Sequence, residues 1–212
     1  MGKYDKGILG AISGKVGTVV GSRWKGIRYL RSLAGPKKGV PSIAQLKQQA
    51  RFALGVQFLQ PIHPIIKIGY RTQIRKQSPY NAALSDLLTS VIEGDYPEYQ
   101  INFERFRMSK GTMEPPFNPE VHLESNQLTF SWNNNSETGD AAAGDQALLL
   151  VLAENMWPVF DIHSFKRENA SGTINLSDLS SGQQLYCFMA FAGTGDNKSV
   201  SNSALVGVIT VP

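Results

Sequence analysis

The sequence predicts an α+β protein in which a basic, glycine-rich β-hairpin and several helices precede an antiparallel β-sandwich. Two patterns predict this fold: apolar residues recur at helical spacing in the first half, and short apolar runs separated by polar turns fill the second half. We expect a basic β-plus-helical region over residues 1–94, a strand and proline-rich joint over 95–119, and the β-sandwich over 120–212.

Residues 14–34 have the composition of a β-hairpin or of two short strands. The β-forming residues are Val16, Val19, Val20, Trp24, Ile27, Tyr29 and Leu30, separated by Gly17, Gly21 and Gly26. Glycine inside a strand marks a bend, a bulge or the close approach of another backbone. The following segment, 35–41, contains two glycines and two prolines and can continue neither a strand nor a helix.

Three helices are predicted after this connector. Ser42 is a good N-cap for the first, whose apolar residues recur at helical spacing up to the stop at Pro61. Shorter helices are expected over residues 65–74 and 79–93.

The second half reads as a series of strands. Polar and apolar residues alternate from Tyr99 to Phe106, as in a half-buried strand, and residues 111–119 form a proline-rich joint. Short strands separated by polar turns then indicate a sandwich. These strands are expected over residues 127–132, 146–153, 159–165, 171–176, 184–192 and 204–211.

Charge is distributed very unevenly along the chain. Residues 1–85 carry 15 basic side chains and 1 acidic side chain, whereas residues 86–212 carry 6 basic and 16 acidic ones, although the net charge is only +4. Such asymmetry is informative about partners and association, not about fold. It points to a polyanion or to the acidic half of another copy.

No catalytic or metal-binding pattern accompanies this charge. Residues 10–15 approach a phosphate-binding loop, but only three residues separate the two glycines and Val16 stands where Ser or Thr is required. The single cysteine, Cys187, lies among apolar residues and is expected to pack in the core. The histidines lie far apart in the sequence: His63, His122 and His163. We therefore expect a non-enzymatic protein that needs no metal and no cofactor.

The N-terminal residues lack the pattern of a signal peptide, and no run approaches the roughly 18 apolar residues of a membrane span. We expect synthesis in the cytoplasm, without a signal peptide and without a membrane span. Whether the chain then enters a released particle or filament is left open.

The basic N-terminal cluster is the candidate contact surface. Within a strand, Arg23 and Lys25 would face one side and Trp24 the other. The cluster could bind phosphates and bases, it could contact another copy, or its apolar residues could pack in the core while its charges are solvated. Assembly is favoured over nucleic acid because the acidic half would repel a polyanion. The candidate residues are Lys15, Gly17, Arg23, Trp24, Lys25, Gly26, Arg28, Arg31, Lys37 and Lys38.

Several motifs at the N-terminus resemble the opening of an uncharacterised bacterial family of about 210 residues, a domain of unknown function. This resemblance extends over the whole chain. They are Gly14-Lys15-Val16-Gly17, Arg23-Trp24-Lys25-Gly26, Arg31, Pro36 and Ser42-x-x-Gln45-x-x-Gln48-x-x-Arg51-Phe52. The first 60 residues are also loosely similar to phage particle proteins. The family has no assigned activity, and the looser similarity implies a structural component of a repeating assembly.

Three C-terminal segments resemble the fibronectin type III group: Leu128–Trp132, Tyr186–Ala190 and Ser199–Ser203. This resemblance implies a β-sandwich that binds or spaces other domains. Taken together, the observations predict a non-enzymatic structural protein, such as a filament, tube or phage-like particle component. It would form a homo-oligomer or polymer through its N-terminal region and display the sandwich outward. The alternative is a nucleic-acid-binding module that uses the basic half.

Overall fold

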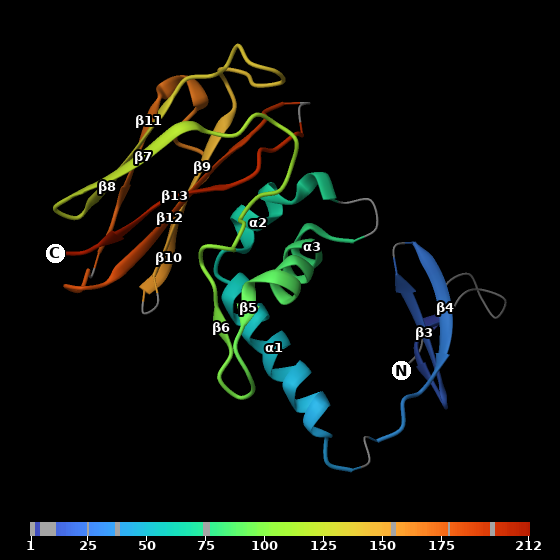
Figure 1. Cartoon of the computed structure of the whole chain (residues 1–212). Coiled ribbons are helices and arrows are strands. Elements are labelled where there is room, and N and C mark those ends of the chain that lie inside the picture. The colour runs from blue at the N-terminus through green and yellow to red at the C-terminus, as the bar shows by residue number, and fades with distance from the viewer. Residues whose placement is uncertain are drawn as a thin grey trace. The chain divides into compact units, whose positions relative to one another are not determined.

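The structure is a computed structural model that describes residues 3–4, 12–24, 26–36, 39–73, 77–153, 156–177, 179–195 and 198–212. Helices and antiparallel strands in several sheets confirm the predicted α+β class. The chain forms two compact units (Figure 1): Met1–Ser42, called unit 1, and Ile43–Pro212, called unit 2.

Unit 1 is a four-stranded antiparallel sheet in the order β1-β2-β3-β4. Its strands are β1 (Lys3–Tyr4), β2 (Ile12–Val16), β3 (Val19–Trp24) and β4 (Ile27–Ser32). The predicted hairpin is therefore part of a larger sheet. A two-residue turn joins β2 to β3, and its first residue, Gly17, has a φ of +57°, which suits the glycine favoured at that position of a type II′ turn.

Unit 2 begins with the three predicted helices. They are α1 (Ile43–Leu59), α2 (His63–Gly69) with the 3₁₀ turn η1 (Arg71–Gln73), and α3 (Pro79–Asp86) with the π-helical turn η2 (Leu87–Val91). The side chain of Ser78 caps α3 by accepting a hydrogen bond of 3.2 Å from the backbone N–H of Asn81. Only the C-terminal half of α1 packs in the core, where Gly55 and Leu59 are buried.

The segment after the helices differs from its prediction. The third helix ends at η2, and β5 (Ile92–Glu93) pairs with β6 (Gln100–Ile101). The expected strand over 99–106 is reduced to two residues, because the backbone then turns and Phe106 N–H donates to the Phe103 carbonyl oxygen at 3.2 Å.

Two antiparallel sheets form a β-sandwich, as predicted. One sheet has the order β11-β8-β7 and the other β10-β9-β12-β13. The strands are β7 (Phe117–Glu124), β8 (Gln127–Asn133), β9 (Gln146–Ala153), β10 (Met156–Asp161), β11 (Ser171–Asn175), β12 (Gln184–Ala192) and β13 (Ala204–Thr210). A short 3₁₀ turn, η3 (Arg167–Asn169), precedes β11. Strand β7 was not predicted, and its first residues lie in the predicted joint.

The four-stranded sheet of the sandwich is buried on both faces. Along β9, Leu148, Leu150 and Leu152 belong to the core that the sheet shares with the helices. The intervening Leu149 and Val151 belong to the core between the two sheets. The same division holds along β12, so unit 2 consists of a helical layer, a central sheet and an outer sheet (Figure 1).

A buried ion pair ties together the loops at one end of the sandwich. Arg167 Nε lies 3.2 Å from Asp145 Oδ2, and both side chains are almost fully buried. The Arg167 guanidinium lies 3.8 Å from the ring centre of Phe191, and the indole N–H of Trp132 donates to the Arg167 carbonyl oxygen at 2.9 Å. Removing either side chain of such a pair would leave the other charge buried and unpaired, which is strongly destabilising. The pair therefore holds these loops in one arrangement.

The unit boundary lies between residues 42 and 43, and the predicted boundaries at 94 and 119 fall inside unit 2. Helical residues such as Ile65 pack in the same core as strand residues such as Phe188. The Arg71 guanidinium donates three hydrogen bonds of 2.7–2.8 Å to carbonyl oxygens between β12 and β13. The predicted joint is also packed, because Met113 is buried and its N–H donates to Val200.

We expect limited proteolysis to cut first between residues 33 and 42, because the described part of this segment is exposed and lacks regular structure. Trypsin can cut there after Lys37 or Lys38. Mass spectrometry of the digest should find a resistant fragment close to residues 43–212. A stable fragment that begins near residue 120 would show that the sandwich folds separately from the helices.

Candidate functional site

The N-terminal sheet exposes nearly all of its side chains. Gly21 is the one buried residue among those that the structure describes in unit 1. Trp24, Ile27 and Leu30 are 59%, 64% and 61% exposed, although each is large and apolar. The unit also carries nine basic side chains and one acidic one. This combination of apolar and cationic exposure is unusual for a folded unit and makes the sheet a candidate contact surface.

The strand register divides the predicted contact residues between the two faces of the sheet. Residues that pair across strands point to the same face. Trp24 pairs with Ile27, and two positions further along the same face Tyr29 pairs with Ser22. Lys15 and Arg31 also lie on this face, because both pair with Val20.

The opposite face carries the other two described arginines. Arg23 pairs directly with Arg28, so two cationic side chains lie side by side next to the β3–β4 turn. Like charges directly opposite each other destabilise a sheet. The prediction that Arg23 and Trp24 face opposite sides agrees with this register. Lys25, Lys37 and Lys38 lie outside the described residues.

The glycines of the predicted contact surface have conformational roles. Gly17 occupies the β2–β3 turn and has no neighbour that a Cβ atom would meet, and Gly26 follows β3 with a φ of +86°. The close backbone approach expected in this segment occurs instead at Gly21. A Cβ atom there would lie 2.0 Å from the Ile12 carbonyl oxygen, so no larger residue fits.

Not every basic residue of the N-terminal half is available for a partner. Arg51 Nη2 donates to the carbonyl oxygens of Leu88 and Ile92 at 2.8 and 3.4 Å. Its guanidinium also lies 5.7 Å from the centre of the Tyr99 ring. Together with Arg71, this residue holds unit 2 together. A sequence count of charges cannot separate such internal arginines from surface ones.

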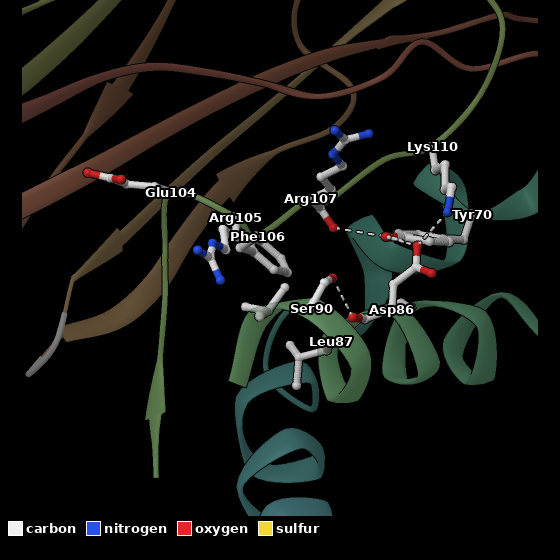
Figure 2. A pocket seen from close by; sticks show the side chains of 11 residues that line it. Tyr70, Asp86, Leu87, Ser90, Glu104, Arg105, Phe106, Arg107 and Lys110 are labelled. Carbon is white, nitrogen blue, oxygen red and sulfur yellow. Dashed lines mark hydrogen bonds and ion pairs between the residues drawn. The ribbon is translucent and has the colours of Figure 1, made fainter. Parts of the chain in front are cut away.

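A pocket in unit 2 brings charged and aromatic side chains together (Figure 2). Its volume is about 400 Å³, and it lies between α3 and the segment 104–110. The Tyr70 hydroxyl lies 3.3 Å from Asp86 Oδ2 and 3.2 Å from the Arg107 carbonyl oxygen. Lys110 Nζ lies 3.0 Å from the same carboxylate oxygen. Burial, and to a smaller extent the Asp86 charge, raises the pKa of Tyr70 above its usual range.

These contacts describe a structural link between three segments. The Tyr70 hydroxyl donates within the pocket, and Asp86 is already neutralised by Lys110. Across the described ranges there is no group of three or more His, Cys, Asp or Glu side chains that could hold a metal ion. None of the helices in the described part of the chain is long and apolar enough to cross a membrane. No local sequence pattern predicts this pocket, because its residues come from distant segments.

Residues 11–207 match the family of unknown function DUF6266. The chain belongs to this family. No curated protein matches the chain. The expected membership of an uncharacterised family is thereby confirmed. The DUF6266 match begins before β2 and ends within β13, so it includes strands β2, β3 and β4 of the N-terminal sheet together with most of unit 2.

Tyr70 gives a pH-dependent prediction. Its pKa in the folded state lies above the unfolded value of about 10, so its contribution to stability is present below that pH and is lost as the pH rises above it. As the pH rises from about 10 to about 12, the free energy of unfolding should therefore fall more steeply for the wild type than for Tyr70→Phe. Denaturant unfolding at several pH values measures this. Tyr96→Phe, which changes an exposed tyrosine, is the control, and equal slopes for wild type and Tyr70→Phe would contradict the account.

Proposed function

We propose that this protein is a non-enzymatic structural component that self-associates through its N-terminal sheet and displays its β-sandwich. The observation that carries the proposal is the exposure of unit 1. It is a four-stranded sheet whose one buried residue, within its described part, is a glycine. Folded units of about 40 residues usually need disulfides, metals or oligomerisation to be stable. The sole cysteine of the chain lies in unit 2, which leaves association as the simplest source of stability.

The edge strand β4 is suited to a partner. All six of its residues are exposed, and among the described strands it has β3 as its neighbour on one side only. Soluble proteins usually protect edge strands with charges, prolines or bulges. Here two arginines are interspersed with Ile27, Tyr29 and Leu30, so the edge is charged but also strongly apolar. A partner that buries these apolar side chains would gain about 25 cal/mol per Å².

Charge favours another copy as this partner. Unit 1 has a net charge of +8, whereas unit 2 has a net charge of −4. Arg23 and Arg28 lie opposite each other on one face of the sheet, so a nearby carboxylate would be attracted by both. Each copy therefore provides both a basic apolar surface and an acidic unit, and repeated contact between two such unlike surfaces can build a filament, tube or phage-like particle.

We also propose that the sandwich is of the fibronectin type III kind. Its first, second and fifth strands form one sheet, and the remaining four form the other. The segments Leu128–Trp132 and Tyr186–Ala190 lie in β8 and β12, which supports the resemblance seen in the sequence. Such modules bind or space other domains, a role that suits a displayed part.

The proposal predicts that wild-type protein sediments as large species at micromolar concentration. The double variant Trp24→Ala with Ile27→Ser should raise the concentration for half-assembly at least tenfold, because exposed aromatic and apolar side chains usually dominate interfaces. Phe117→Ala, which removes an exposed aromatic side chain from unit 2, should leave assembly unchanged. A wild type that stays monomeric at high concentration and low salt would refute self-association.

The nucleic-acid alternative is kept because Arg23 and Arg28 form a cationic pair that a phosphate would also neutralise. Binding to phosphates should weaken with salt by about 0.9 units of log affinity per contact and per unit of log salt. Contacts that bury apolar surface should persist. We expect particles of nuclease-treated protein to survive moderate salt. Particles that dissolve on nuclease treatment alone would favour the nucleic-acid role.

A further inference from the structure

Unit 2 contains an apolar groove between α1, β6 and the edge of the sandwich. Its volume is about 540 Å³. The side chains that dominate the lining are Leu54, Phe58, Tyr99, Phe103, Leu152 and Trp157. Trp157 is 75% exposed, the largest exposure of any aromatic side chain described. An exposed tryptophan beside an apolar groove is typical of an interaction site.

The loop that leads into the groove residue Tyr99 is acidic, and we call this loop the rim. The loop between β5 and β6 carries Asp95 and Glu98, which are both exposed, and Glu98 directly precedes the groove residue Tyr99. The neighbouring Glu93 lies 3.9 Å from Arg105, so it is partly neutralised. Arg51 lies near Tyr99, but its guanidinium donates to backbone carbonyls of unit 2. The rim therefore offers two carboxylates to a cationic partner.

The β3–β4 tip of unit 1 has the complementary composition. Beside the turn, it carries the cross-strand pair Trp24 and Ile27 on one face and the pair Arg23 and Arg28 on the other. Tryptophan and arginine are the residue types most enriched among the residues that dominate protein interfaces. The tip thus carries an apolar anchor for the groove and a positive charge that complements the negative charge of the rim.

We propose that the apolar groove of one copy receives the β3–β4 tip of a second copy. This inference rests on the proposed self-association and names its receiving surface. Trp24 and Ile27 enter the groove beside Trp157, and Arg23 and Arg28 face Asp95 and Glu98. The contact joins two unlike surfaces, and every copy carries both. Repetition of a head-to-tail contact produces a ring or an open filament.

Disulfide cross-linking between two variants tests the contact. One variant carries Ile27→Cys in the tip, and the other carries Gln100→Cys in the groove lining. The native Cys187 does not interfere, because it is buried and burial raises the pKa of its thiol to about 12. Mixing the two under mild oxidation should give a cross-linked dimer. Replacing Gln100→Cys by Val208→Cys, an exposed position outside the groove, should not.

The outcomes separate this inference from the proposed function. If the mixture sediments as large species but cross-links no better than the Val208→Cys control, the groove is not the receiving surface, although self-association stands. If wild-type protein does not assemble at the same concentration, self-association itself fails. If a chain carrying both Ile27→Cys and Gln100→Cys closes an internal disulfide while monomeric, the groove receives the tip of its own chain, and the second copy is excluded.

Charge reversal gives an independent test. The double variant Asp95→Lys with Glu98→Lys should raise the concentration for half-assembly at least tenfold, because it places four cationic side chains at the contact. Adding Arg23→Glu and Arg28→Glu to the same chain restores complementarity at every contact and should restore assembly. All four positions are exposed, so folding should be unaffected, and unreactive Cys187 reports that unit 2 is intact. A quadruple variant that assembles no better than the double variant would overturn the inference.

Discussion

Burial of the central sheet on both faces is the constraint on which the structure of unit 2 depends. The strands β9 and β12 are apolar on both sides, so neither a helical layer nor an outer sheet alone could cover them. Alternate residues of one strand serve two cores, and the loss of either layer would expose half of them to water. Arg71, Met113 and the Arg167–Asp145 pair then fix the connections between the layers. Helices and sandwich therefore fold as one body.

The sheet of unit 1, in contrast, is exposed on both faces. It also consists of four strands, yet its large apolar side chains remain exposed on both faces. In unit 2 such apolar side chains are buried by the neighbouring layers. The sheet of unit 1 therefore needs a covering layer from outside itself. The charges of the two units, the paired arginines and the apolar groove with its acidic rim point to another copy as that cover. Assembly would then complete the fold of unit 1 as well as build the particle.

Local patterns predicted most elements of this structure. The apolar stripe between Ser42 and Pro61 predicted the first helix, and the runs over 146–153 and 184–192 match β9 and β12 residue for residue. The boundaries between parts were not predictable in the same way. Continuous apolar runs indicate burial on both faces, but nothing local shows that the second face is covered by helices from the other end of the chain. From Pro119 onward β7 alternates between half-buried and exposed residues, but the prolines before and within it led to its first residues being predicted as a joint.

The candidate surface was predictable in composition but not in arrangement. The basic and aromatic residues of 15–31 are evident from the sequence, whereas their division between two faces follows from the register of β3 and β4. The roles of Arg51 and Arg71 depend on contacts 37 or more residues away along the chain. The apolar groove is built from four separate segments, so no motif could indicate it.

The central claim is that the N-terminal sheet is stabilised by a neighbouring copy, and hydrogen exchange at two protein concentrations tests it most directly. The account predicts that the backbone amides of Ile27–Ser32 exchange quickly in dilute monomer and become protected as the protein assembles. The amides of β9 and β12 should be strongly protected at both concentrations, because their burial is internal to unit 2. Equal protection of Ile27–Ser32 in dilute monomer and in concentrated protein would contradict the account.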